Sequence, residues 1–369
     1  MSRFLQLHLL TFVPPANLNR DDTGRPKTAV VGGATRLRLS SQALKRAWRT
    51  APVFAEAMKD HMGRRTQRLG EEILESLGAE GIAPERALAA ARAVAGQFGK
   101  LKEDENPARI EQLAFIAPEE WEAAFALARR YASGDLALPD QAKGKAKGRK
   151  KEAEGDEAPP ALSLLRESDT AADIALFGRM LADNPAFNRE AAAQVAHAIT
   201  THRVVVEDDY YTAVDDLKRP SEDAGAGFIG EAGFGSGVFY LYACINQELL
   251  VKNLGGDAKA RDLAATAIAA LVEAAATTAP SGKQNSFAAH SRAGFILAEK
   301  GSAQPRTLAG AFAKPVEGPD LMAASISALE TFRGALDQAY GPAAEAASVM
   351  RVGGEGSLAE IIAFARAGG

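Results

Sequence analysis

The sequence predicts an α+β fold, and three observations lead to this class. Residues 3–13 and 35–39 alternate apolar and polar side chains as strands do, and residues 58–133 follow a helical pattern. Later in the chain, strand-like and helical segments alternate. The predicted order is two strands and a helix, a helical insertion, a strand, a hairpin-like excursion, and then strand, helix, strand and helix. This order fits a split β-α-β framework that carries insertions.

The N-terminal segments predict two strands separated by a loop. Residues 3–13 (RFLQLHLLTFV) alternate imperfectly and predict a buried strand, and the turn-forming residues of 14–33 predict a long loop. The segment TRLRL, residues 35–39, predicts a second strand with Arg36 and Arg38 on one face.

Residues 40–59 predict a helix whose N-cap is Ser40 or Ser41. One face of this helix carries three cations, an amide and no acid: Gln42, Lys45, Arg46 and Arg49. The opposite face is apolar: Ala43, Leu44, Ala47 and Trp48. A helix that is only solvated on its polar face usually mixes both signs of charge, so this pattern favours an anionic partner.

The segment that follows predicts a helical lobe of its own. Three helical stretches, each bounded by Gly or Pro, occupy residues 63–78, 83–99 and 117–134. Residues 140–160 are basic and then acidic, with low sequence complexity, and predict a mobile linker.

The second half of the chain predicts strands and helices in alternation. Residues 190–206 are ambiguous, but the Thr and Val residues at their end favour a strand. Residues 207–237 form a long, acidic excursion punctuated by glycine. The elements predicted after it are a strand at 238–246, helices at 247–253 and 257–280, a strand or hairpin at 286–301, and two helices near 319–340 and 357–367.

The composition is that of a globular protein. Of the 369 residues, 47% are hydrophobic and 24% are charged. A single cysteine, Cys244, excludes an internal disulfide framework and fits a reducing compartment. No run approaches the roughly 18 apolar residues that a membrane helix needs, and the N-terminus lacks the features of a signal peptide. We therefore expect a cytoplasmic protein.

Positive charge is concentrated between residues 20 and 49, although the chain has a formal net charge of −4. Eight basic residues stand there against only Asp21 and Asp22. The eight are Arg20, Arg25, Lys27, Arg36, Arg38, Lys45, Arg46 and Arg49. Such a patch suits a phosphate backbone, since each neutralised phosphate releases counterions. An ordinary exposed face remains the alternative on these residues alone.

Other motifs carry less weight. The glycines of GFGSG, residues 233–237, precede a strand and lack the lysine of a phosphate-binding loop, so they indicate a flexible hairpin. His197 and His202 have no companion ligands, and we expect them to be structural. Tyr210 and Tyr211 either pack under a loop or stack on bases. Three acid pairs raise a metal-nuclease alternative: Asp21–Asp22, Asp208–Asp209 and Asp215–Asp216.

Several motifs occur together in a fixed order along the chain. They are LNRDD (18–22), GGATRLRLSSQALKRAWR (32–49), DIALFGRM (173–180), AHAITTH (196–202), YTAVDDL (211–217), GSGVFYLYACIN (235–246) and NLGG (253–256). In order and spacing this set closely resembles the backbone subunit (CasC) of the type I-E CRISPR Cascade, an RNA-guided DNA surveillance complex. The helical lobe and the last hundred residues resemble it only in outline.

The resemblance implies an RRM-like (ferredoxin-like) palm, an inserted helical fingers domain and a protruding β-hairpin thumb. The implied boundaries are palm at 1–58, fingers at 59–193, a palm strand at 194–203, thumb at 204–238 and the remaining palm at 239–369. The resemblance further implies that about six copies stack head to tail along one guide RNA (crRNA), through an interface that does not close on itself. The implied partners are crRNA, other copies of the chain, other Cascade subunits and target DNA paired with the guide, with no membrane.

Guide-RNA contacts are carried over by the resemblance to positions on the palm, after the FGR motif and on the thumb. They are Arg20, Lys27, Ser40, Gln42, Lys45, Arg46, Arg49, Arg179, Met180, Tyr210, Tyr211, Thr212 and Val214. Met180 matches the residue that wedges between bases and helps to kink the guide at regular intervals. The tyrosine pair stands where a Trp-Phe pair also occurs in the family. Since the resembled subunits are not nucleases, no catalytic residue, metal or cofactor is implied.

Three questions stay open. A basic tract in the divergent fingers either holds target DNA or is part of a linker: Lys143, Lys145, Lys147, Arg149, Lys150 and Lys151. A rival function is a metal-dependent ribonuclease of a related CRISPR effector, using Asp21 or Asp22, because related type III backbone subunits cleave RNA with a loop aspartate. A third class is a structural filament without nucleic acid, and the single-signed basic face argues against it.

Overall fold

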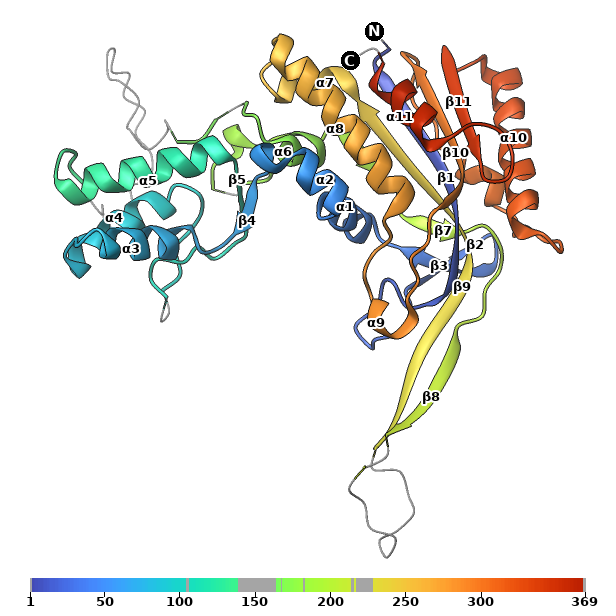
Figure 1. The fold of residues 1–369 in the computed structure, drawn as a ribbon, viewed down its shortest axis with the longest axis horizontal. Helices are drawn as coiled ribbons and strands as arrows, with labels where there is room; N and C mark the ends of the chain where they lie inside the picture. The colour runs from blue at the N-terminus through green and yellow to red at the C-terminus, as the bar shows by residue number, and fades with distance from the viewer. Residues whose placement is uncertain are drawn as a thin grey trace, which may run out of the picture. The chain divides into compact units, whose positions relative to one another are not determined.

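A computed structural model describes residues 2–103, 106–138, 164–166, 168–181, 183–213, 216 and 228–367. The chain forms two compact units, and the α+β fold class is confirmed (Figure 1). Unit 1 comprises Met1–Ala57, Ala193–Glu248 and Asp262–Gly369. Unit 2 comprises Met58–Ala192 and Leu249–Arg261. The palm range implied at 239–369 thus includes thirteen residues, 249–261, that the structure groups with unit 2.

Unit 1 is built on an antiparallel sheet, which among the described residues has nine strands in the order β11-β10-β1-β9-β7-β3-β2, with β6 and β8 also paired to β9. The strands are β1 (Phe4–Ala16), β2 (Thr28–Val31), β3 (Ala34–Leu39), β6 (Ala193–Val195), β7 (Ala198–Thr200), β8 (Glu207–Ala213), β9 (Phe228–Asn246), β10 (Ala293–Gly301) and β11 (Ala346–Arg351). The N-terminal strand lies at the centre, because β1 pairs with β10 on one side and β9 on the other.

Helices cover both faces of this sheet (Figure 1). On one face, Ile326 and Leu329 of α10 pack against Leu10, Tyr240 and Phe295. On the other face, α1 and α8 pack over the sheet. The helices that lie in unit 1 or enter it are α1 (Ser41–Arg49), α2 (Pro52–Ala57), α7 (Gln247–Asn253), α8 (Ala258–Thr277), α9 (Gln284–Phe287), α10 (Leu321–Tyr340) and α11 (Leu358–Arg366).

Local chemistry explains where the observed elements differ from the predicted ones. The single helix predicted at 40–59 is two helices, because Pro52 cannot continue the hydrogen bonding of α1 and instead begins α2. The loop predicted at 14–33 contains the short strand β2, which pairs with β3 through a turn at Gly32 and Gly33. Both glycines have positive φ angles, which other residues rarely adopt. The strand β11 was not predicted from the sequence.

Unit 2 is mainly helical. Its elements are β4 (Arg64–Thr66), α3 (Leu69–Ala79), α4 (Pro84–Ala95), β5 (Ala114–Ile116), α5 (Pro118–Ser133) and α6 (Ala172–Phe177). The three helices predicted at 63–134 are thus present, although residues 64–66 of the first predicted helix form the strand β4. Helices α3, α4 and α5 share one apolar core that includes Ile73, Val94 and Leu127. The linker predicted at 140–160 lies outside the described residues.

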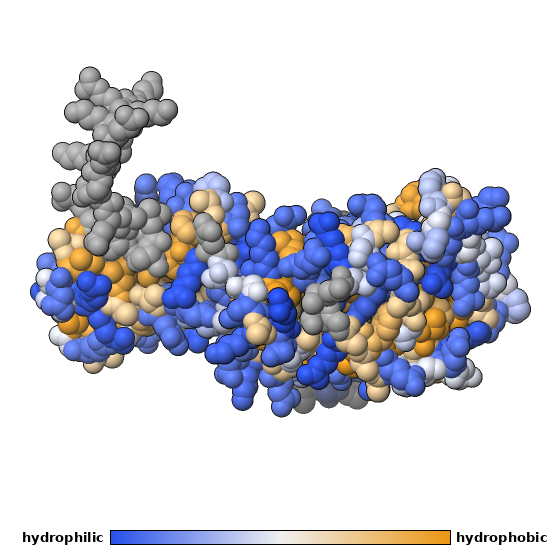
Figure 2. Space-filling model, turned by 90° about the horizontal axis from the view of Figure 1, so that it is seen from above, coloured by the Kyte–Doolittle hydropathy of each residue, from blue (hydrophilic) through white to orange (hydrophobic). Residues whose placement is uncertain are grey.

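Polar and apolar side chains are interspersed on the face of both units that Figure 2 shows. Within the described parts of the chain, no helix combines the length and the hydropathy needed to cross a membrane.

Candidate nucleic-acid interface

The cationic helix face predicted from the sequence exists on α1. The Ser40 hydroxyl caps this helix by accepting a 3.3 Å hydrogen bond from the Ala43 amide. Leu44 and Trp48 are buried in unit 1. Their burial turns the opposite face outward, where Gln42 and Arg46 are exposed and Lys45 and Arg49 are half-buried. Ser40 itself is buried, so its hydroxyl serves the helix cap.

The loop between β1 and β2 lies directly beside the start of α1. Asn19 Oδ1 accepts a 2.8 Å hydrogen bond from the Ser40 amide, and the Lys27 amide donates to the Asn19 carbonyl at 2.8 Å. A backbone bridge between Arg20 and Pro26 closes the loop. The structure therefore brings Arg20 and Lys27, which lie far from α1 in sequence, next to the N-terminal end of its cationic face.

Lys45 has an unusual environment for an outward-facing lysine. Partial burial lowers the pKa of its ammonium group below the ordinary value, because desolvation penalises the charged form. An anion placed against this partly buried ammonium would be screened less by water than one placed against a fully hydrated lysine. This side chain is accordingly the most informative one to change on α1.

Of the two arginines of β3, Arg36 differs from the expectation that both extend the basic patch. Arg36 is fully buried, and its guanidinium donates to the carbonyl oxygens of Thr200 at 2.8 Å and Phe312 at 3.1 Å. Arg36 is therefore a structural residue of unit 1. Arg38 is half-buried, and its Nη1 lies 2.8 Å from Nδ1 of His197.

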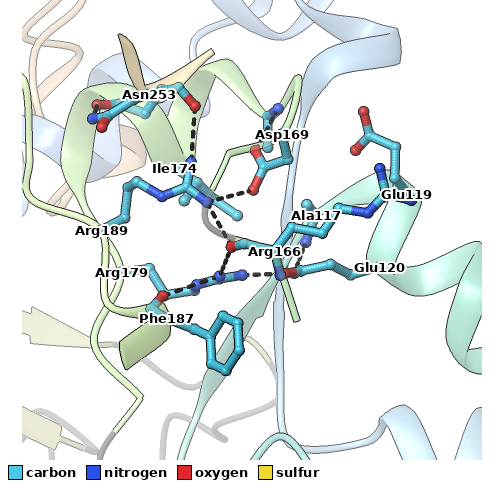
Figure 3. Close-up of polar contacts among 12 residues, drawn as sticks. Ala117, Glu119, Glu120, Arg166, Asp169, Ile174, Arg179, Phe187, Arg189 and Asn253 are labelled. Carbon is cyan, nitrogen blue, oxygen red and sulfur yellow. Dashed lines mark hydrogen bonds and ion pairs between the residues drawn. The ribbon is translucent and has the colours of Figure 1, made fainter. Parts of the chain in front are cut away.

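Arg179 also differs from its assignment as an RNA contact. Its side chain is fully buried in unit 2 and forms a 2.6 Å ion pair with Glu120, which is equally buried (Figure 3). The same guanidinium donates to the carbonyl oxygens of Phe115, Arg166 and Phe187. Because these groups enclose it, the Arg179 side chain is unavailable to a ligand, and its role is to hold together the segment around residues 164–190.

Met180 lies between two anchored neighbours and is itself 75% exposed. On one side, the backbones of Arg179 and Arg189 exchange hydrogen bonds of 3.0 and 2.8 Å. On the other side, the buried Leu181 donates its amide to Asn188 Oδ1 at 2.6 Å. The Arg189 guanidinium extends the network in Figure 3 by bonding Asp169 and the Asn253 carbonyl. The family resemblance assigned Met180 to the wedge between bases, and the structure shows that its side chain is exposed and that its neighbours on both sides are anchored.

The excursion predicted at 207–237 contains a β-hairpin made of β8 and the first part of β9. Tyr210 is 61% exposed and Tyr211 is 44% exposed, and Thr212 is also exposed. The ring of Tyr211 lies across Gly230 on the paired strand and 6.1 Å from the ring of Phe228. Val214 and the basic tract from Lys143 to Lys151 lie outside the described residues.

Among the described residues the acid pairs do not converge on a metal site, and Asp215 of the third pair lies outside those residues. The Asp21 carboxylate accepts hydrogen bonds from the hydroxyl and amide of Thr23 and from the Arg25 amide, and these bonds lower its pKa. Asp208 forms a 2.7 Å ion pair with Arg25. Among the described residues, no group of three or more His, Cys, Asp or Glu side chains could hold a metal ion.

One further cation was missed by the sequence analysis. Lys283 precedes the short helix α9 and lines an open hollow together with Arg20 and the base of the hairpin. No periodic pattern marks this lysine, because it lies in a turn between two elements. Only the folded chain places it beside a residue 263 positions earlier.

Comparisons with known proteins agree with this architecture. The chain is 31% identical to a chain of a solved "CRISPR RNA-guided surveillance complex, pre-nicking", covers 99% of both chains and superposes with a TM-score of 0.82. It is 26% identical to a chain of a second "CRISPR RNA-guided surveillance complex", covers 97% of this chain and 94% of that one, and superposes with a TM-score of 0.70. No curated protein matches the sequence. The family described as CT1975-like protein matches residues 5–363. This chain therefore belongs to the CT1975-like protein family.

Proposed function

We propose that this protein is a non-catalytic backbone subunit of a CRISPR surveillance complex, of the CasC kind found in type I-E Cascade. In this proposal, about six copies assemble head to tail along the crRNA, as repeated heterologous contacts allow. They kink the guide at regular intervals and support recognition of target DNA in antiviral defence. The observation that carries the proposal is the α1 face, where a single-signed set of side chains is joined in space by Arg20 and Lys27.

Binding must be independent of guide sequence, since guides differ from one another. Lysine and arginine side chains suit this requirement because they contact phosphates and leave the pairing edges of the bases free. Base pairing then supplies specificity, and the protein supplies charge and shape. Met180 supports the proposed wedge, because its exposed and flexible apolar side chain is anchored on both sides. Unstacking one base step costs roughly a few kcal/mol, which phosphate contacts and subunit contacts must offset.

The ribonuclease alternative using Asp21 or Asp22 is less well supported. Asp21 accepts three hydrogen bonds within its own loop at Oδ1, and among the described residues no group of three or more metal-ligating side chains gathers around it. Asp22 is exposed. We therefore keep the non-catalytic function as the proposal and include a cleavage assay in its test.

The test is a charge reversal on α1 in the full-length protein purified with its guide RNA. Lys45→Glu is expected to lower RNA affinity on the order of tenfold or more, equivalent to about 1.4 kcal/mol or more. The absorbance ratio of the purified particle and a filter-binding titration measure this loss. Lys314→Glu, at an exposed lysine of the same unit, is the matched control.

Undiminished RNA binding by Lys45→Glu would contradict the proposal. The same particle is then incubated with Mg²⁺ or Mn²⁺, and the guide is analysed on a denaturing gel. Intact RNA supports a non-catalytic scaffold. Metal-dependent fragments that disappear in Asp22→Ala would favour the ribonuclease instead.

A further inference from the structure

We infer that the hollow beside Lys283 is a second phosphate-binding site for single-stranded RNA, with Lys283 and Arg20 as its cations. This inference rests on the proposed function, because it extends the RNA path beyond α1. The hollow has a volume of about 330 Å³ and is open to solvent. The charged residues of its lining are Arg20, Arg25, Asp208, Glu231 and Lys283.

The charges of this hollow leave two cations for a ligand. Arg25 and Asp208 neutralise each other through their 2.7 Å ion pair. The side chains of Arg20 and Lys283 have no hydrogen-bonded or ion-paired partner among the described residues, and Glu231 is the remaining acid of the lining. A phosphodiester carries one negative charge, so two cations against one acid accommodate a single phosphate.

The backbone holds Lys283 in place at an energetic cost. Lys283 has a φ angle of 52°, a left-handed conformation that residues other than glycine rarely adopt. A Cβ on the preceding Gly282 would lie 2.3 Å from the Leu18 carbonyl oxygen, so only glycine lets this turn approach the loop that carries Arg20. The turn is thus held against that loop by close backbone packing, which keeps Lys283 beside the arginine.

The same loop connects the hollow to the α1 face. Asn17 donates from its amide nitrogen to the carbonyl oxygens of Gly24 and Gly233, both at 2.9 Å, and so ties the loop to the base of the hairpin. Asn19, next to Arg20, accepts a hydrogen bond from the amide of Ser40, the N-cap residue of α1. Arg20 therefore stands between the hollow and α1. A strand of RNA whose phosphates follow α1 towards Arg20 meets the hollow next.

The experiment measures affinity for a fluorescent oligouridylate at several salt concentrations, using the full-length protein. Lys283→Gly removes the cation while suiting the left-handed backbone. We expect it to weaken binding roughly two- to fivefold, the range of an exposed charge pair. The slope of log affinity against log salt should become shallower by about 0.7, the value for one phosphate contact on a single strand.

Three further variants sharpen this test. Lys283→Arg keeps the charge and should bind like the parent. Glu231→Gln removes the opposing acid and should bind more tightly than the parent. Lys314→Ala, outside the hollow, should leave both affinity and slope unchanged. A general loss of stability would lower RNA affinity in both variants. It would not lower the affinity in Lys283→Gly and raise it in Glu231→Gln.

Comparison with Lys45→Glu distinguishes a failure of the phosphate site in the hollow from a failure of the proposed function. If Lys45→Glu loses RNA but Lys283→Gly keeps the parent's affinity and salt slope, the hollow is not a phosphate site and the proposed function stands. If neither variant changes RNA binding, the proposed function fails as well. An oligothymidylate of equal length is the second probe. A Lys283→Gly effect confined to this DNA would overturn the assignment to RNA.

Discussion

Burial determines which arginines of the basic stretch are available to a ligand. The sequence places Arg36, Arg38 and Arg46 in one basic stretch, yet Arg36 is enclosed by backbone carbonyls while Arg46 is exposed. Burial also lowers the pKa of Arg36, although an arginine in contact with carbonyl oxygens keeps its charge. The surface charge of this region is therefore smaller than the count of basic residues indicates.

A buried polar cluster around His8 of β1 and Glu299 of β10 is expected to make the stability of unit 1 depend on pH. His8 and Glu299 are both fully buried, with Nε2 of the histidine 3.3 Å from a carboxylate oxygen. Nδ1 of His8 lies 2.8 Å from the Tyr240 hydroxyl. Arg333 bonds the same carboxylate at 2.7 Å. If the hydroxyl donates to Nδ1, the proton of the neutral imidazole sits on Nε2 and faces Glu299.

Acid is expected to destabilise unit 1 through this cluster. Desolvation lowers the pKa of His8 below 6.5, so its neutral form stabilises the fold above that pH and this contribution falls as pH drops below it. Desolvation raises the pKa of Glu299, but the hydrogen bond and charge of His8 and the nearby arginines outweigh it and hold the value at about 2. The carboxylate's contribution is therefore lost only as pH falls from 4.5 towards 2.

The measurement is the free energy of unfolding by chemical denaturation between pH 7 and 5.5. In the parent protein it should fall with pH, by at most about 1.4 kcal/mol per pH unit for one group. His8→Phe should be less stable at pH 7 and show a flatter dependence. Equal slopes in the two proteins would refute the role of His8.

The two tyrosines of the hairpin of β8 and β9 lie on opposite faces of β8. Neighbouring residues of a strand point to opposite faces, so Tyr210 and Tyr211 cannot stack on the same base. The Tyr211 ring is already used to cover Gly230 and to contact Phe228. This cross-strand packing supports a hairpin whose β8 side chains are all exposed. Tyr210 is then the ring that remains for a base.

This arrangement predicts different effects for the two rings. Tyr210→Ser is expected to weaken RNA binding by roughly 1–3 kcal/mol, the value of one base–aromatic stack. Tyr210→Phe should bind like the parent. The assay is a titration of RNA that carries 2-aminopurine, whose fluorescence reports stacking. Tyr211→Ser should instead increase hydrogen exchange along β8 and β9, because it removes packing within the hairpin. Equal RNA losses in Tyr210→Ser and Tyr210→Phe would count against stacking.

The candidate RNA contacts are distributed over both units of the molecule. Unit 1 carries the α1 face, the hollow at Lys283 and the hairpin, while unit 2 carries Met180 on a scaffold of buried ion pairs. Replacing one partner of such a pair leaves an uncompensated buried charge, which is strongly destabilising.

Assembly along RNA is expected to depend on the length of the guide. If copies stack head to tail, lengthening the guide should add mass in steps of one 38.8 kDa subunit plus its share of RNA. Mass photometry of complexes formed on a series of guides measures these steps. A mass that stays constant while the guide lengthens would contradict a repeating, open-ended assembly.

The sequence by itself determined much of this protein. Hydrophobic periodicity predicted the α+β class, a buried N-terminal strand, the three helices of unit 2 and the cationic face of α1. These features depend on local pattern, since each needs only the spacing of side chains along one element. The collinear motifs predicted a relation to CRISPR surveillance complexes, which the structural comparisons support.

Only the tertiary structure decided which charges are available. It buried Arg36, which the sequence analysis counted in the basic patch, and Arg179, which the resemblance made an RNA contact, and it brought Lys283 beside Arg20. It also found β2 and β11, short strands whose formation depends on pairing with distant or neighbouring strands. The physical reason is that burial, ion pairing and strand pairing depend on the partners that a residue meets in the folded chain, many of them far away in sequence, and the pattern along a single element does not contain them.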